Sequence, residues 1–199
     1  SVHMGSPCDL LVVGLGNPGD RYEHTRHNVG ADAAMKLADQ QADSLRLEKR
    51  LKAHVGEYRI CDRRVVVAVP TTWMNESGQC VSALVRRYGI EDWSSLVIVH
   101  DELDLPAARV KLKQGGGLAG HNGLRSITAH LHTQDYARIR IGVGRPPGGA
   151  EQGADWVLSK VPKAQREQLG LACEQAADAV VMILDQGMDA AMQQFNASS

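Results

Sequence analysis

The chain has 199 residues, of which 43% are hydrophobic, so it is long and apolar enough to bury the core of a folded domain. Its formal net charge of −1 excludes a generally basic nucleic-acid binder, so a nucleic-acid partner needs a local basic patch. The 4 cysteines form no CxxC pair, which is typical of a reduced cytosolic protein without a thiolate zinc site.

The first strand is predicted at residues 10–15, an apolar run that breaks at the turn GLGNPG, residues 14–19. A helix is predicted over residues 29–42, with Asn28 as its N-cap. The turn resembles half of a dinucleotide-binding fingerprint, but Pro18 lacks the backbone N–H that a pyrophosphate would need. The charged residues 43–52 predict a surface connection.

Two further strands, residues 53–60 and 64–70, flank a turn, and the second is continuously apolar, as expected of a central strand. A polar loop follows, and Ser77 is expected to cap the next helix. The buried strand over residues 96–99 then runs directly into the acidic segment HDELD, residues 100–104.

In the last part of the chain, residues 107–113 and 137–143 alternate between apolar and cationic side chains, which predicts half-exposed strands. Between them, a glycine-rich loop over residues 115–123 precedes a helix that begins near His121. Pro162 opens a long final helix that ends at Gly187. Strands alternating with helices predict an α/β fold, a single three-layer domain with a twisted, mixed sheet flanked by helices.

The domain is expected to span residues 5–199, because the chain contains no internal repeat and no linker. Residues 1–4, Ser-Val-His-Met, are typical of an expression scar and are neither basic nor apolar enough for a signal peptide. No apolar run reaches the roughly eighteen residues that a membrane span requires, so no membrane association is predicted.

Five polar residues stand at predicted turns or strand ends, where α/β proteins bind ligands: Asn17, His27, Asn75, Asp101 and Asn122. A histidine supported by an aspartate is held in one tautomer as a general base. Asparagine amides suit peptide-like groups and can stabilise an oxyanion. Without a G-x-S-x-G motif, the simplest chemistry is base-assisted attack by water.

Two other interpretations stay open at this point. A metal site with His100, Asp101 and Asp104 as ligands is less favoured, because no second His-carboxylate cluster accompanies it. A non-catalytic RNA-binding protein would use the cationic face of the two alternating strands, Lys111, Lys113, Arg138 and Arg140. Such a protein would have no need of a histidine–aspartate pair.

Taken in chain order, five motifs make the sequence resemble bacterial peptidyl-tRNA hydrolases: GLGNPG at 14–19, TRHN at 25–28, PTTWMN at 70–75, HDELD at 100–104 and GHNGL at 120–124. The resemblance implies hydrolysis of the ester between a peptide and the 3′ end of tRNA, which recycles prematurely released peptidyl-tRNA. It also implies a cytoplasmic, metal-independent monomer that needs no cofactor and no obligate protein partner.

The resemblance further implies a role for each matching residue. His27 is the base and Asp101 its orienting partner, Lys113 and Arg140 bind the 5′ phosphate of tRNA, and five residues position the substrate: Asn17, Tyr22, Met74, Asn75 and Asn122. Two departures from the better-known members stand out. Leu118-Ala119-Gly120 replaces His-Gly-Gly in the glycine loop, and Trp73 replaces Phe or Tyr.

Overall fold

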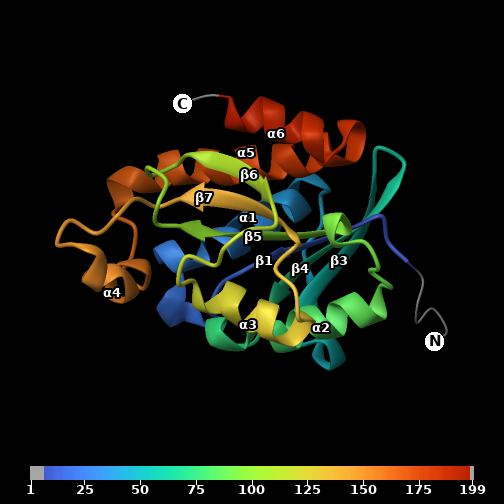
Figure 1. Cartoon of the computed structure of the whole chain (residues 1–199), viewed down its shortest axis with the longest axis horizontal. Helices are drawn as coiled ribbons and strands as arrows, with labels where there is room; N and C mark the ends of the chain where they lie inside the picture. The colour runs from blue at the N-terminus through green and yellow to red at the C-terminus, as the bar shows by residue number, and fades with distance from the viewer. Residues whose placement is uncertain (1–6, 198–199) are drawn as a thin grey trace.

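A seven-stranded sheet with the order β2-β3-β4-β1-β5-β7-β6 forms the centre of the molecule (Figure 1). The computed structural model describes residues 7–197, so the predicted scar at residues 1–4 lies outside the described residues. The strands are β1 Leu10–Gly14, β2 Arg46–Glu48, β3 Ala53–Ile60, β4 Arg63–Pro70, β5 Leu96–Glu102, β6 Val110–Gln114 and β7 Ala137–Gly142.

The middle of the sheet is parallel, with β4, β1, β5 and β7 side by side, while β2, β3 and β6 are antiparallel to their neighbours. The predicted mixed sheet is therefore confirmed. Because β1 and β5 are neighbouring parallel strands, their carboxyl ends and the loops that follow lie at the same edge.

Helices cover both faces of the sheet. Leu10 and Val12 of β1 belong to the core beneath α1, α5 and α6, whereas Leu11 and Val13 face the core beneath α2 and α3. Figure 1 shows α5 and α6 on one side of the sheet and α2 and α3 on the other, which confirms the three-layer prediction. The helices are α1 Val29–Gln40, α2 Ser77–Arg87, α3 Asn122–Leu131, α4 Gly153–Val157, α5 Lys163–Gln186 and α6 Met188–Asn196.

None of the helices within residues 7–197 is long and apolar enough to cross a membrane. Short 3-10 turns connect several of the helices and strands. The turns are η1 Asp20–Tyr22, η2 Arg26–Asn28, η3 Lys49–Leu51, η4 Met74–Glu76, η5 Trp93–Ser95 and η6 Ala150–Gln152.

The structure corrects several predicted elements. The segment 43–52 is not only a connection, since it contains β2, a charged edge strand whose three residues are all exposed. Strand β6 begins at Val110 rather than at residue 107. Ser77 does not cap α2, because its hydroxyl donates to the carbonyl of Met74. Helix α4 is too short to leave a periodic pattern in the sequence.

Gly30 lets α1 pack closely on the sheet, and its replacement by alanine is expected to be strongly destabilising. A Cβ at this position would lie 2.1 Å from the carbonyl oxygen of Val99 in β5, so two pieces of backbone would have to separate. We expect Gly30→Ala to lower the free energy of unfolding by at least ~1–3 kcal/mol, the usual range for overpacking.

Urea unfolding would measure this change, with Gly170→Ala as the matched control. Gly170 also lies in a helix, but an added Cβ there meets nothing within 4 Å. Alanine is the better helix former, so the control should raise stability by about 0.5–1 kcal/mol. Equal effects of the two substitutions would contradict the close approach of α1 to β5.

Candidate active site

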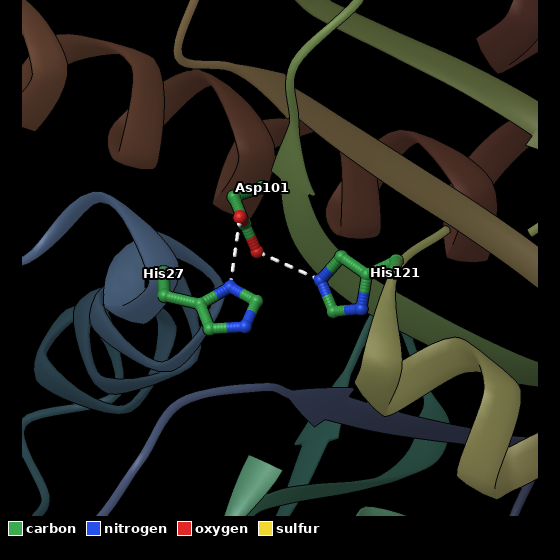
Figure 2. A group of neighbouring side chains, drawn as sticks. All are labelled: His27, Asp101 and His121. Carbon is green, nitrogen blue, oxygen red and sulfur yellow. Dashed lines mark hydrogen bonds and ion pairs between the residues drawn. The ribbon is translucent and has the colours of Figure 1, made fainter. Parts of the chain in front are cut away.

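His27 and Asp101 meet where the first helix begins beside the end of β5. His27 lies in η2, directly before α1, and Asp101 lies near the end of β5 (Figure 2). The Nδ1 atom of His27 is 2.9 Å from Oδ2 of Asp101, and the two residues are only 7% and 3% exposed. The structure thus brings the predicted base and its predicted partner into direct contact.

A second histidine, His121, binds the other oxygen of the same carboxylate. Its Nε2 atom lies 2.8 Å from Oδ1 of Asp101, so the carboxylate stands between the two rings (Figure 2). Sequence reasoning gave His121 no role of its own. Its place at the junction of the glycine loop and α3 was visible, but that it turns back toward β5 depends on the path of the loop.

The backbone at the start of α3 determines which nitrogen of His121 carries a proton. The N–H groups of Gly123 and Leu124 donate to Nδ1 of His121, which therefore acts as the N-cap acceptor of the helix. The neutral ring consequently carries its hydrogen on Nε2 and donates it to Asp101. His121 is thus held as a fixed donor to one side of the carboxylate.

Asp101 is an ionised carboxylate despite its burial. Burial alone would raise the pKa of this carboxyl, but the His121 and His27 rings outweigh it and hold the pKa well below its usual range. An ionised carboxylate only accepts hydrogen bonds, so Nδ1 of His27 donates. The Nε2 lone pair of His27 is left on the side of the ring away from Asp101 (Figure 2).

His100, next to Asp101 in β5, is a neutral histidine. Its Nδ1 donates to the carbonyl oxygen of Asp101 over 2.8 Å, and its ring packs edge-on against that of His121. Burial, followed by the neighbouring His121, lowers the pKa of His100 to about 3. His100 therefore adds no positive charge beside His27 and Asp101 at neutral pH.

The predicted alternative of a metal site on His100, Asp101 and Asp104 is not assembled. Asp104 is exposed and pairs with Arg145 at 2.7 Å, and Nδ1 of His100 donates to a backbone carbonyl, so within the described residues these three side chains do not form a ligand cluster. Ligand atoms of a different set, His27, Asp101 and His121, do lie within 4.8 Å of one another. In that set, Asp101 makes hydrogen bonds with both rings, through Nδ1 of His27 and Nε2 of His121.

Asn17 is held by its neighbour from the TRHN motif. The side chain of Asn28 accepts from the backbone N–H of Asn17 at 2.8 Å and donates to its carbonyl at 2.9 Å. Asn28 occupies the predicted N-cap position of α1, but its side chain makes no capping bond. It binds the backbone of Asn17 instead. The Oδ1 atom of Asn17 accepts from the N–H of Met74, and its amide NH₂ makes no hydrogen bond to any residue between 7 and 197.

The other predicted substrate residues come from η1, η4 and the start of α3. Met74 is buried, and a Cβ on Gly123 would come within 2.6 Å of its sulfur, so Met74 lies beside the start of α3. Asn75 in η4 and Asn122 at the start of α3 are both exposed. The ring of Tyr22 meets that of Trp73 edge-on, with centroids 5.8 Å apart.

A hollow of about 440 Å³ opens over the histidine–aspartate cluster. It extends from His27 and Asp101 to the cations of the β6–β7 edge, and the glycine loop and α4 form its walls. Of the predicted site residues, this hollow includes His27, Asp101, Lys113, Asn122 and Arg140, whereas Asn17, Tyr22, Met74 and Asn75 lie outside its lining.

The predicted cationic face forms, because β6 and β7 are neighbours with Lys111 opposite Arg140 and Lys113 opposite Arg138. Its four members are nevertheless not equivalent. Arg138 is only 2% exposed and donates to the carbonyls of Gly116, Gly117 and Gln134, so it anchors the glycine loop. Arg138 is therefore unsuited to bind RNA directly.

A buried arginine joins α4 to η2, the turn that contains His27. The guanidinium of Arg26 stacks over the ring of Trp156 at 3.4 Å from its centroid and donates to the hydroxyl of Ser159. The backbone N–H of Arg26 also donates to the carbonyl of Ser159. Because α4 lines the hollow, this contact holds that wall beside His27, and no sequence pattern predicted it.

Comparisons with known proteins identify the family of this chain. The sequence model of the family described as "Peptidyl-tRNA hydrolase" matches residues 11–199. The peptidyl-tRNA hydrolases of Rhodococcus erythropolis and Nocardia farcinica are 47% and 48% identical, over 91% and 94% of this chain and 94% and 95% of theirs.

Among solved structures, the peptidyl-tRNA hydrolase of Acinetobacter baumannii superposes with a TM-score of 0.88 at 38% identity. That superposition covers 97% of this chain and 98% of the other. The chain therefore belongs to the peptidyl-tRNA hydrolase family, and it is a hydrolase whose substrate is peptidyl-tRNA.

Proposed function

We propose that His27 is the general base that activates water for attack on the ester between the peptide and the 3′ end of tRNA, and that this reaction recycles peptidyl-tRNA released prematurely from ribosomes. The observation that carries the proposal is the buried contact of His27 Nδ1 with Asp101, which leaves Nε2 as a proton acceptor. A histidine with one ring nitrogen bound to a carboxylate and the other left as an acceptor is suited to act as a general base.

In this mechanism Nε2 of His27 takes a proton from a water molecule while the water oxygen attacks the ester carbonyl carbon. The tetrahedral intermediate collapses by breaking the bond to the ribose oxygen. The His27 imidazolium then returns the proton to that oxygen, so the products are a peptide carboxylic acid and a tRNA with a free hydroxyl. Asp101 stabilises the transient positive charge of His27 and keeps its ring in place.

Asparagine amides stabilise the developing oxyanion and position the substrate. Since Oδ1 of Asn17 already accepts from Met74, the NH₂ group of Asn17 is the donor available to an oxyanion or a peptide carbonyl. Asn75 and Asn122 supply further amide contacts from exposed positions. Tyr22 and Met74 contribute to the peptide site, with the exposed Trp73 ring as an aromatic wall in place of the more common Phe or Tyr.

Lys113 and Arg140 bind the 5′ phosphate of the tRNA. Both line the hollow that contains His27, so one substrate can reach the cations and the base together. A terminal phosphate monoester carries more charge than an internal diester, which gives the enzyme a way to select the tRNA end.

The proposal includes the absence of any metal or cofactor requirement, a monomeric state without an obligate protein partner, and a cytoplasmic location. Its direct test is release of free tRNA from a peptidyl-tRNA analogue by the purified protein in the presence of excess chelator. Undiminished turnover is the expected result. Activity that disappears with the chelator and returns with added metal would contradict the mechanism.

Replacing Lys113 with alanine is expected to weaken the binding of full-length peptidyl-tRNA but not that of a minimal substrate. Loss of one phosphate contact should raise KM and reduce the salt dependence of binding by a slope of roughly 0.7–0.9. A minimal substrate, a peptide ester on a short 3′ fragment, never reaches this residue, so its KM should not change.

Steady-state kinetics on both substrates across a salt series would check this prediction. Lys49→Ala is the matched control, because Lys49 follows β2 at the opposite edge of the sheet. Equal losses on the two substrates would instead assign Lys113 to the catalytic centre or to the stability of the fold.

A further inference from the structure

Glu102 is a buried carboxylate in the hollow that the proposed chemistry does not use. It is the last residue of β5, one position after Asp101, and is only 7% exposed. Its Oε1 atom accepts from Nε of Arg140 at 3.1 Å, and its Oε2 atom accepts from the backbone N–H of Asp104 at 3.2 Å. Both oxygens are therefore engaged, and the side chain is held from two directions.

This contact determines which edge of Arg140 is available to a ligand. A guanidinium presents two edges that can make paired hydrogen bonds, and one of them includes Nε. Glu102 occupies the Nε position, so the edge formed by the two terminal nitrogens is the one left for a phosphate. Within the described part of the chain, those terminal nitrogens make no hydrogen bond or ion pair.

Among the four cations of the β6–β7 face, Arg140 alone is paired with a carboxylate in the part of the chain that the structure describes. Arg138 is fixed by loop carbonyls, and Lys113 is an exposed cation on the neighbouring strand. The planar guanidinium of arginine can bind two phosphate oxygens with paired hydrogen bonds, which requires that its nitrogens face the phosphate. Glu102 provides that orientation in the same hollow as the catalytic pair.

We propose that Glu102 is a positioning residue that aims the terminal edge of Arg140 at the 5′ phosphate of tRNA, and so determines how strongly the enzyme prefers a phosphorylated 5′ end. This inference rests on the proposed role of Arg140 as a phosphate ligand. The carboxylate also offsets part of the charge of Arg140, which disfavours contacts with phosphate groups that cannot reach both terminal nitrogens.

The test compares kcat/KM for two full-length peptidyl-tRNAs that differ only in a 5′ phosphate or a 5′ hydroxyl. The ratio of the two values is taken for each protein, so a smaller folded fraction in any variant cancels. We expect the ratio to fall toward 1 in both Arg140→Ala and Glu102→Ala. Glu102→Gln keeps an oxygen that can accept from Nε, so its ratio should stay at or above that of the unaltered protein.

Asp104→Ala is the matched control, because Asp104 is a neighbouring carboxylate in an arginine ion pair, but an exposed one with Arg145. Its ratio should equal that of the unaltered protein. If Glu102→Ala keeps the preference for the 5′ phosphate while Arg140→Ala loses it, the proposed role of Glu102 is wrong but the phosphate site stands. A Glu102→Gln variant as unselective as Glu102→Ala would also overturn it, whereas a retained ratio in Arg140→Ala would reject the phosphate site itself.

Discussion

Replacement of His27 by alanine is expected to slow hydrolysis of peptidyl-tRNA by about 10²- to 10⁴-fold, the usual contribution of a positioned general base. In the proposed mechanism Nε2 of His27, which faces away from Asp101, takes a proton from water, and alanine leaves no group to do so. Binding of tRNA should be almost unchanged, since the proposed phosphate contacts lie at the β6–β7 edge of the hollow.

Single-turnover kinetics would measure the catalytic loss, and a binding titration with deacylated tRNA would measure the affinity. His54→Ala is a suitable control, because it removes an exposed histidine from β3. Turnover of the His27 variant close to that of the unaltered protein would mean that another group activates the water.

Asp101→Asn is expected to be the second most damaging change, and the structure gives a specific reason. The backbone N–H groups that donate to Nδ1 of His121 fix its Nε2 as a hydrogen-bond donor. An asparagine at position 101 must then turn its amide oxygen toward His121 and its NH₂ toward His27. That NH₂ requires Nδ1 of His27 to accept, which places the imidazole hydrogen on Nε2 and removes the base.

We therefore expect Asp101→Asn to lower kcat by between about 10² and 10⁴-fold, without exceeding the loss of His27 itself, as when a catalytic histidine is held in the wrong tautomer. Nitrogen-15 chemical shifts of the His27 ring would report the tautomer directly. Asp104→Asn, which alters an exposed carboxylate of the same segment, should keep nearly full activity. A fully active Asp101→Asn variant, or an unchanged His27 tautomer, would contradict this account.

The sequence predicted an element correctly where a local pattern of apolar and charged residues fits only one kind of secondary structure. The continuous apolar runs of β4 and β5 predicted buried central strands, and the alternation in β6 and β7 predicted a cationic face, because strand side chains point to opposite sides in turn. Asp101 was predicted at a strand end, and the structure includes it in the last part of β5.

Contacts between distant segments could not be read in the same way. Alternation predicted the face on which Arg138 lies. It did not predict that the Arg138 guanidinium would donate its hydrogen bonds to carbonyls of the glycine loop. Spacing predicted Asn28 as a helix cap, whereas its side chain binds the backbone of Asn17 eleven positions earlier. The contact of His121 with Asp101 depends on how the intervening loop folds back.

The central claim is direct attack by water, and the timing of product release tests it most directly. Peptide and tRNA should be followed together in a rapid-mixing experiment with enzyme at a concentration close to that of peptidyl-tRNA, in the presence of chelator. Our account predicts that both products rise with one rate constant and without a burst. A burst of tRNA equal to the enzyme concentration, followed by slower release of peptide, would reveal a covalent peptidyl-enzyme and contradict the proposed mechanism.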